Sequence, residues 1–218
     1  MSVVGIVPAG GRGERLGVDR PKAFVVLAGR PMLDWSVRVL ASICDRVVVA
    51  VPAGHEEPPD RVAGGASRSA SVRAGLAAAP EAAVVVVHDA ARPLITLDLV
   101  ERCVAALREG DADGVIAAAP VTDTIKQADG SGRVVRTLDR SNLWAVQTPQ
   151  VFRAGALRRA LEVDEATLAR ATDDASLVEA AGGTVAVVQS SPENLKVTTP
   201  LDLRLAETLL ELRAPQGV

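Results

Sequence analysis

Residues 3–22 have the sequence Val3-Val4-Gly5-Ile6-Val7-Pro8-Ala9-Gly10-Gly11-Arg12-Gly13-Glu14-Arg15-Leu16-Gly17-Val18-Asp19-Arg20-Pro21-Lys22. The apolar run at residues 3–7 is typical of a buried strand. The glycines that follow let backbone N–H groups come close to a bound group, and N–H groups at the start of a helix bind anions. Arg12, Arg15, Arg20 and Lys22 add positive charge. This stretch therefore predicts a strand followed by a loop that binds a phosphate-rich ligand.

The same order of buried strand, polar turn and helix recurs along the chain. Apolar runs predict strands at residues 47–51, 84–87, 114–119 and 185–188, and apolar periodicity predicts helices at residues 31–40, 97–107, 154–161, 174–181 and 199–213. Strands without alternation are typical of parallel sheets that helices cover on both faces. We therefore expect an α/β fold, a Rossmann-like three-layer sandwich with a mostly parallel sheet, in a single domain over residues 1–218.

Residues 120–143 interrupt this rhythm. Two alternating segments, residues 121–128 and 133–138, flank the turn Asp129-Gly130-Ser131-Gly132. This is the chemistry of a β-hairpin. We therefore expect a projecting β-arm at residues 120–143, after which residues 139–152 return the chain to the core.

Composition excludes several classes of protein. A formal net charge of −3 and a pI of about 5.5 argue against an extended nucleic-acid-binding surface, which is usually basic. The apolar runs are too short to span a bilayer, and the N-terminus lacks the pattern of a signal peptide. Cys44 and Cys103 each lie in an apolar stretch, so buried free thiols in a reducing compartment are expected. A cytoplasmic protein with no membrane partner follows.

The polar clusters follow predicted strands or turns that lead into helices. They comprise residues 10–22, residues 65–71 and residues 89–92. Ligands of open α/β sheets bind at the carboxyl ends of the strands. One site built from all three clusters is therefore expected, rather than a glycine-rich surface turn with solvated charges.

Two common phosphate loops do not fit. The dinucleotide fingerprint needs Gly-x-Gly-x-x-Gly or Ala, and the run that begins at Gly11 has Leu16 at its last position. A P-loop needs Lys after Gly, whereas Lys22 follows Pro21. An NAD-dependent enzyme and a P-loop NTPase are both disfavoured.

A resemblance to a known family covers nearly the whole chain. The loop Pro8-Ala9-Gly10-Gly11-x-Gly13-x-Arg15-Leu16-Gly17 with Pro21-Lys22 resembles the signature of sugar and polyol nucleotidyltransferases. Five further motifs are His88-Asp89-Ala90-Ala91-Arg92-Pro93, Pro120-Val121-x-Asp123-Thr124-Ile125-Lys126, Gln147-Thr148-Pro149-Gln150-x-Phe152, Thr172-Asp173-Asp174-Ala175-Ser176 and Asn194-x-Lys196-Val197-Thr198. Together they are similar to the 2-C-methyl-D-erythritol 4-phosphate cytidylyltransferase family of non-mevalonate isoprenoid biosynthesis. Gly10 and Ala66 depart from the family, which commonly has Ala and often an acidic residue there.

The resemblance implies a reaction. The phosphate of 2-C-methyl-D-erythritol 4-phosphate attacks the α-phosphate of CTP in line and gives 4-diphosphocytidyl-2-C-methyl-D-erythritol and pyrophosphate. Such chemistry needs positioning and cations more than proton transfer. The implied catalytic residues are Arg15 and Lys22, which stabilise the transition state, and Arg140 and Lys196, which position the substrate phosphate.

The resemblance also implies binding roles. CTP would contact Pro8, Ala9, Gly10, Gly11, Gly65 and Ser71, and the polyol phosphate would contact Asp89, Arg92, Thr124, Arg140, Thr148 and Lys196. Asp89 is also the candidate ligand for Mg²⁺ or another divalent cation. In the family the arm hooks over a second subunit, so a homodimer is expected in which Thr124 and Arg140 complete the partner's site. His88, Asp173 and Asp174 are expected to be structural.

Two other functions share these features. A cytidylyltransferase for ribitol 5-phosphate, or another polyol phosphate, has most of the same motifs. A non-catalytic nucleotide-binding regulator on this scaffold is expected to lack Arg15, Lys22 or Lys196, and the chain has all three.

Overall fold

The computed structural model of the chain describes residues 1–11, 13–17 and 21–213. Its seven-stranded sheet has the order β11 (Val185–Gln189), β7 (Gly114–Pro120), β10 (Trp144–Arg153), β6 (Val84–Val87), β1 (Val3–Pro8), β4 (Arg46–Val51) and β5 (Arg61–Ala63). All neighbours are parallel except that β10 runs antiparallel to both β6 and β7. The mostly parallel sheet is therefore confirmed. Arg12 and Arg20 lie outside the described residues.

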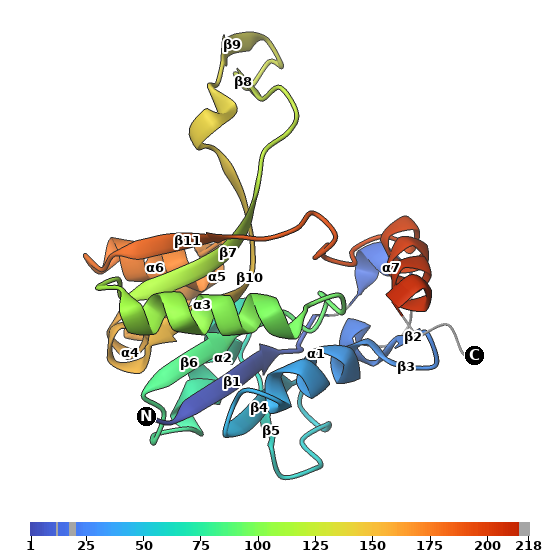
Figure 1. Cartoon of the computed structure of the whole chain (residues 1–218), viewed down its shortest axis with the longest axis vertical. Coiled ribbons are helices and arrows are strands. Elements are labelled where there is room, and N and C mark those ends of the chain that lie inside the picture. The colour runs from blue at the N-terminus through green and yellow to red at the C-terminus, as the bar shows by residue number, and fades with distance from the viewer. Residues whose placement is uncertain (12, 18–20, 214–218) are drawn as a thin grey trace.

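Helices cover both faces of this sheet (Figure 1). One face packs on α1 (Met32–Ala41) and α3 (Leu97–Glu109), and the other packs on α2 (Arg68–Ala77), α4 (Ala154–Leu161), α5 (Glu165–Arg170) and α6 (Asp174–Ala180). Val3 and Val7 of β1 face the first layer, and Val4 and Ile6 face the second. Burial on both faces explains the unbroken apolar run of β1 and confirms the three-layer sandwich.

A third, smaller core lies beside the sheet. The helix α7 (Pro200–Arg213) packs there against the short hairpin of β2 (Val26–Leu27) and β3 (Arg30–Pro31). Leu16 of the opening loop and Val197 are buried in the same cluster. This core therefore anchors two segments that reach the candidate site.

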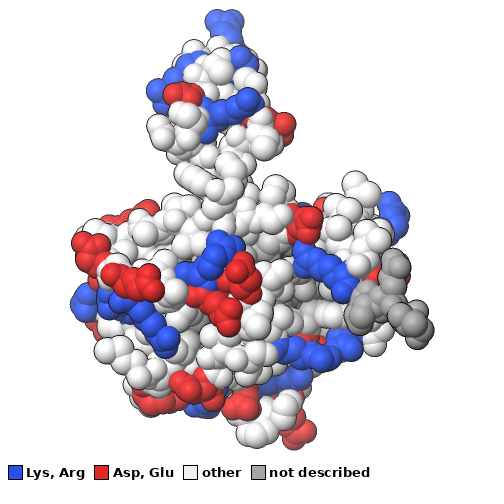
Figure 2. Space-filling view, in the orientation of Figure 1, with Lys and Arg blue, Asp and Glu red and all other residues white. Residues whose placement is uncertain are grey.

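The arm projects from the body (Figure 1). It carries β8 (Lys126–Ala128) and β9 (Val134–Thr137), which pair antiparallel. The turn is closed by Asp129, whose carboxylate accepts hydrogen bonds from the Ser131 and Arg133 N–H groups. Both strands are shorter than predicted, and residues 121–125 lie outside them. Basic side chains gather on the arm (Figure 2), where every strand residue is exposed.

Several elements were not predicted. The segment expected only to return to the core is β10, a central strand of the main sheet. The strands β2, β3 and β5 span two or three residues each, and such short pieces give no periodicity for a pattern to detect. The helix α5 was also missed.

Other expectations are confirmed. Cys44 and Cys103 are both buried free thiols. The Thr96 hydroxyl caps α3, expected at residues 97–107, by accepting from Leu99 N at 3.3 Å. Among the described residues, no helix has the length and apolar character needed to cross a bilayer.

Candidate active site

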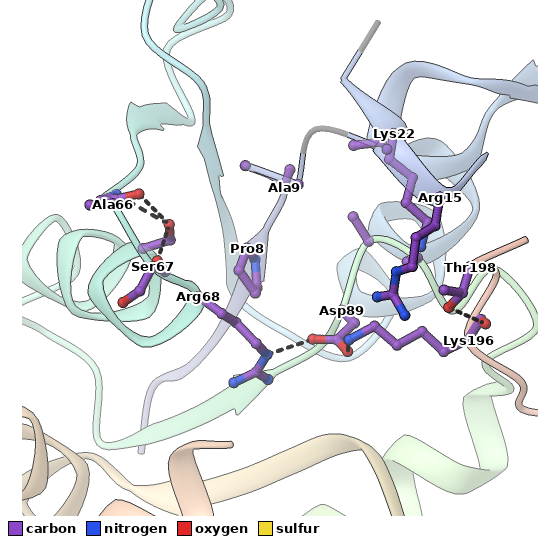
Figure 3. Close-up of a pocket in the computed structure, with 18 residues that line it drawn as sticks. Pro8, Ala9, Arg15, Lys22, Ala66, Ser67, Arg68, Asp89, Lys196 and Thr198 are labelled. Atoms are coloured by element: carbon purple, nitrogen blue, oxygen red, sulfur yellow. Dashed lines mark hydrogen bonds and ion pairs between the residues drawn. The ribbon is translucent and has the colours of Figure 1, made fainter. Parts of the chain in front are cut away.

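A cavity of about 460 Å³ opens at the carboxyl ends of β1 and β6. Its walls come from residues 8–11, 13, 15 and 22–23 of the opening loop, residues 65–68 and 71, residues 89–91, and Lys196 with Thr198. The three polar clusters that the sequence singled out therefore do meet at one edge of the sheet. Figure 3 shows their side chains converging on the cavity.

The opening loop folds back on itself. Ala9 N donates to Ala50 O at 2.7 Å, Leu16 N donates to Gly13 O at 2.8 Å, and Lys22 N donates to Gly11 O at 3.0 Å. Gly13 has a φ of 78°, a conformation that glycine adopts at little cost. These contacts, with buried Leu16 as an anchor, place Arg15 and Lys22 on the cavity wall.

Positive charge dominates the cavity. Arg15, Lys22, Arg68 and Lys196 line it, and Asp89 is the one carboxylate among its described lining residues. Partial burial, together with Lys196 and Arg15 nearby, lowers the pKa of Lys22 to about 8. A bound polyanion would stabilise the charged form of Lys22, which agrees with the predicted phosphate-rich ligand.

The turn at residues 64–71 has its own internal support. Ser67 caps α2 by accepting from Ala70 N at 3.2 Å. The Ser71 hydroxyl accepts from Gly65 N at 3.1 Å and donates to Ser67 O at 2.9 Å. A Cβ on Gly65 would lie 2.4 Å from Ala70 Cβ, so only glycine fits there. A Cβ on Gly10 would lie 3.8 Å from Ser71 Oγ, so the alanine common in the family has room at that position.

Asp89 sits at the centre of an ion-pair network (Figure 3). Its Oδ1 lies 2.8 Å from Arg68 Nε, and its Oδ2 lies 2.7 Å from Lys196 Nζ. Burial disfavours the ionised carboxylate, but Arg68 and Lys196 outweigh it and hold the pKa of Asp89 well below its usual range. Asp89 is therefore a fully ionised carboxylate with a cation on each oxygen.

Sequence reasoning missed Arg68 and its pairing with Asp174. Arg68 Nη1 lies 2.5 Å from Oδ2 of Asp174, a fully buried carboxylate on the first turn of α6. Burial disfavours the Arg68 cation, but Asp89 and Asp174 together raise its pKa. The available signal was a lone arginine in the small-residue run 64–71 that leads out of a glycine turn.

A chain of hydrogen bonds supports Asp89 from behind. The Thr148 hydroxyl accepts from Asp89 N at 3.1 Å and contacts His88 Nδ1 at 2.9 Å, and His88 Nε2 lies 3.1 Å from Arg92 O. A carbonyl only accepts, so Nε2 carries the proton and Nδ1 accepts the Thr148 proton. Burial lowers the pKa of His88 to about 4. His88 is thus a neutral structural residue, as expected.

The remaining predicted residues lie outside the cavity. Arg92 Nη1 donates to Asn194 O at 2.7 Å and its Nε lies 3.9 Å from Asp89 Oδ2, so it connects Asp89 to the segment that precedes Lys196. The Thr148 hydroxyl donates its hydrogen bond to His88 Nδ1. Thr124 and Arg140 are exposed on the arm, where the Arg140 guanidinium donates to Thr122 O. Substrate contacts by these residues stay predictions.

Two acidic residues begin α6 as expected. Asp173 is the N-cap, with Oδ1 accepting from Ser176 N at 2.9 Å and Oδ2 accepting from Gln150 Nε2 at 2.8 Å. Asp174 follows it and pairs with Arg68. Neither side chain is among those that line the cavity, which agrees with their predicted structural role.

The segment that carries Lys196 is tied down by α7. Asp202 Oδ2 accepts from Thr198 N at 2.9 Å and from Thr199 N at 2.8 Å, and Val197 N donates to Ala91 O at 2.8 Å. Thr198, a lining residue that sequence reasoning also missed as part of the site, is fixed by the same contacts. The backbone beside Lys196 is held in place, while its side chain is 43% exposed.

A mostly parallel α/β sheet, a glycine-rich loop after its first strand and converging cations at the carboxyl edge are the features of an α/β enzyme that binds a phosphate-rich nucleotide. The model of the 2-C-methyl-D-erythritol 4-phosphate cytidylyltransferase family matches residues 3–212. The chain belongs to this family and is a CTP-dependent nucleotidyltransferase of isoprenoid biosynthesis.

Individual relatives agree with this assignment. The chain is 51% identical over 225 residues to the 2-C-methyl-D-erythritol 4-phosphate cytidylyltransferase of Nocardia farcinica, a match that covers 98% of this chain and 96% of the relative. It is 49% identical over 219 residues to that of Rhodococcus jostii, covering 96% and 95%. The crystal structure of the enzyme from Thermus thermophilus has a TM-score of 0.81 at 36% identity and covers 97% of this chain and 100% of that one. The resemblance stated from the motifs is therefore confirmed.

Proposed function

We propose that the cavity at the carboxyl ends of β1 and β6 is where this chain joins 2-C-methyl-D-erythritol 4-phosphate to CTP. The convergence of Arg15, Lys22 and Lys196 around one cavity, opposite a single ionised carboxylate among the described lining residues, is the observation that carries the assignment. It matches a reaction in which two anions must be brought together and held.

CTP occupies the opening-loop side of the cavity. Backbone groups of residues 8–11 take the triphosphate, and Arg15 and Lys22 stabilise the charge that develops on pyrophosphate. The lowered pKa of Lys22 supports this role, because a bound polyanion relieves its repulsion by Lys196 and Arg15. The turn from Gly65 to Ser71 holds the base, and the Ser71 hydroxyl shapes that turn through Gly65 N.

The polyol phosphate occupies the side of Asp89. Lys196 Nζ leaves Asp89 Oδ2 and pairs with the substrate phosphate, a movement that its partly exposed side chain allows. The freed oxygen then accepts a hydroxyl of the polyol. Lys196 thus has two alternative partners, Asp89 in the free protein and the phosphate in the complex.

The chemical step is an in-line displacement. A phosphate oxygen of the substrate attacks the α-phosphorus of CTP, and the bond to the bridging oxygen breaks, so that the electron pair leaves on pyrophosphate. The attacking phosphate is already ionised, and no proton has to be removed from it. Arg15, Lys22, Lys196 and Arg140 contribute charge and position rather than acid–base catalysis.

A divalent cation, Mg²⁺ by preference, fits this site through one protein ligand. Among the described residues there is no group of three or more His, Cys, Asp or Glu side chains arranged for a metal. Mg²⁺ needs few carboxylates where phosphates supply oxygens, and Asp89, the one carboxylate among the described lining residues, would be its ligand from the protein. When bound, the cation supplies charge neutralisation on the triphosphate. Chelation by EDTA should abolish turnover, and added Mg²⁺ should restore it.

The arm completes the site of a second copy. Val134 is 56% exposed and Val135 is 62% exposed, and an isolated two-stranded hairpin needs a covering surface to be stable. A homodimer in which each arm covers the other body provides that surface and brings Thr124 and Arg140 to the partner's cavity. We propose that the chain is a single domain whose arm, residues 120–143, forms the dimer. Its proposed location is the cytoplasm.

Pyrophosphate release tests the function. The purified protein with Mg²⁺ and CTP should release pyrophosphate with 2-C-methyl-D-erythritol 4-phosphate much faster than with ribitol 5-phosphate. Faster turnover of ribitol 5-phosphate would assign the alternative cytidylyltransferase, and CTP binding without turnover of either would assign a nucleotide-binding regulator.

A further inference from the structure

We propose that Arg68, anchored by Asp174, is a positioning residue that keeps Asp89 oriented and charge-balanced after Lys196 has moved to the substrate phosphate. The inference rests on the proposed roles of Asp89 and Lys196 described above. It assigns a function to a buried pair that those roles do not use.

The contacts of Arg68 are divided between two carboxylates. Its Nε lies 2.8 Å from Asp89 Oδ1, and its Nη1 lies 2.5 Å from Asp174 Oδ2. A guanidinium presents several donors in one rigid plane, whereas a lysine ammonium is a point charge on a flexible stem. Arginine therefore transmits the fixed position of Asp174, which is fully buried, to Oδ1 of Asp89.

Charge balance gives this arrangement a purpose. Asp89 has one cation on each oxygen in the free protein, Arg68 on Oδ1 and Lys196 on Oδ2. When Lys196 leaves, Arg92 Nε stays 3.9 Å from Oδ2, too far to donate a hydrogen bond. A buried carboxylate without a hydrogen-bonded cation would be costly. Arg68 remains as that cation, and Oδ2 becomes free to accept a substrate hydroxyl. Asp174 in turn prevents Arg68 from following Lys196 to the phosphates.

The placement of Arg68 in α2 supports a role beyond folding. Arg68 is the first residue of this helix, and the first turn contains no acidic residue. The positive end of a helix dipole favours acids and disfavours a cation there. Local helix stability therefore does not account for an arginine at this position, whereas the two carboxylates do.

A conservative substitution tests the inference. Arg68→Lys keeps the charge but cannot hold both carboxylates in one plane. We expect the KM for 2-C-methyl-D-erythritol 4-phosphate to rise about tenfold, while the KM for CTP changes less than about twofold. Arg73→Lys is the matched control, because Arg73 lies on the same helix and pairs with exposed Glu165 of α5. It should leave both KM values unchanged.

A double-mutant cycle asks whether Arg68 acts through Asp89. In an Asp89→Asn background, Arg68→Lys should cause little further change in the KM for the polyol phosphate. Asp174→Asn, which keeps the shape of the anchor and removes its charge, should raise the same KM by a smaller factor. If circular dichroism shows that the Arg68 variant folds poorly, the KM of the Asp174→Asn variant still tests the inference.

The outcomes separate the inference from the proposed function. Equal rises in both KM values would overturn the positioning role and indicate a direct ligand contact instead. Unchanged KM values with a lower melting temperature would also overturn it and indicate a purely structural pair. If the wild-type protein released no pyrophosphate with the polyol phosphate, the proposed function would fail first. An active wild type with unaffected Arg68 and Asp174 variants would refute the inference alone.

Discussion

The cavity and the arm are built in opposite ways. The charged centre of the cavity is fixed by contacts within the chain, such as the pairing of Asp89 with Arg68 and Lys196. The arm has no core of its own, and its predicted site residues, Thr124 and Arg140, are exposed. The charged centre of the cavity is held within one chain, whereas the arm exposes Thr124 and Arg140, which we propose act at the cavity of a second copy.

This difference separates two kinds of functional residue. Residues at the centre of the cavity contribute to stability and to function together, because their partners are buried. In the proposed dimer, Thr124 and Arg140 of the arm contribute to function without contributing to the fold of the body. Substitutions in the two regions should therefore differ in their effect on melting temperature as well as on activity.

The largest effect is expected from glycine in the cavity wall. Gly65→Ala places a Cβ 2.4 Å from Ala70 Cβ, which displaces the turn that we propose holds the base and should lower kcat/KM for CTP by a factor of about 100 or more. Gly10→Ala places a Cβ 3.8 Å from Ser71 Oγ, so only a small loss is expected. Steady-state kinetics with varied CTP measures both, and equal losses would show that the turn does not hold the base.

A somewhat smaller effect is expected from the arm. Arg140→Ala should lower kcat/KM for the polyol phosphate about 100-fold or less, through loss of one cation at the substrate phosphate. The melting temperature should stay the same, because the hydrogen bond of Arg140 goes to the arm carbonyl of Thr122. Arg133→Ala, also on the arm, is the control and should leave kinetics unchanged. A lower melting temperature for Arg140→Ala would show that this arm residue stabilises the fold, as residues of the body do.

The pH dependence of CTP binding probes the cavity alone. The pKa of Lys22 is lowered to about 8 in the free protein, so its charge is lost as the pH rises through 8. CTP affinity should therefore fall above that pH, by at most about tenfold per pH unit, and binding near pH 8 should take up a proton. Calorimetry in buffers of different ionisation enthalpy measures both. Lys22→Arg should flatten the profile, and a profile unchanged by this substitution would exclude Lys22 as its source.

The smallest effect concerns a turn of the body. Ala28 has a φ of 45° and Gly29 a φ of 79° in the loop between β2 and β3, a conformation that disfavours alanine. Ala28→Asn should raise the free energy of unfolding by about 0.5–1 kcal/mol, because asparagine tolerates this conformation better. Urea denaturation measures the change. If Ala28→Asn lowered the free energy of unfolding and Ala28→Val lowered it no further, the backbone strain at Ala28 would be absent.

Most of the body was predictable from sequence because its signals are local. The run at residues 84–87 predicted β6 with the correct ends, and the motifs after β1 and β6 indicated the cavity. The antiparallel direction of β10 was not predictable, because no local pattern states which strands it pairs with.

The network behind Asp89 was hidden for the same reason. Arg68 and Asp174 are 106 positions apart in the chain, and only the packing of α2 and α6 on the same face of the sheet brings them together. The orientation of Thr148 toward His88 likewise depends on two neighbouring strands. Motifs identified many of the residues that line the cavity, but not the contacts that orient their side chains.

Complementation between two inactive variants tests most directly whether the site joins the body of one chain to the arm of another. Lys22→Ala and Arg140→Ala proteins, mixed in equal amounts and refolded together, should form heterodimers that contain one intact site each. About half of the dimers would be heterodimers, so pyrophosphate release should recover to about a quarter of the wild-type rate. Activity that stays at the mean of the two separate variants would contradict a shared site.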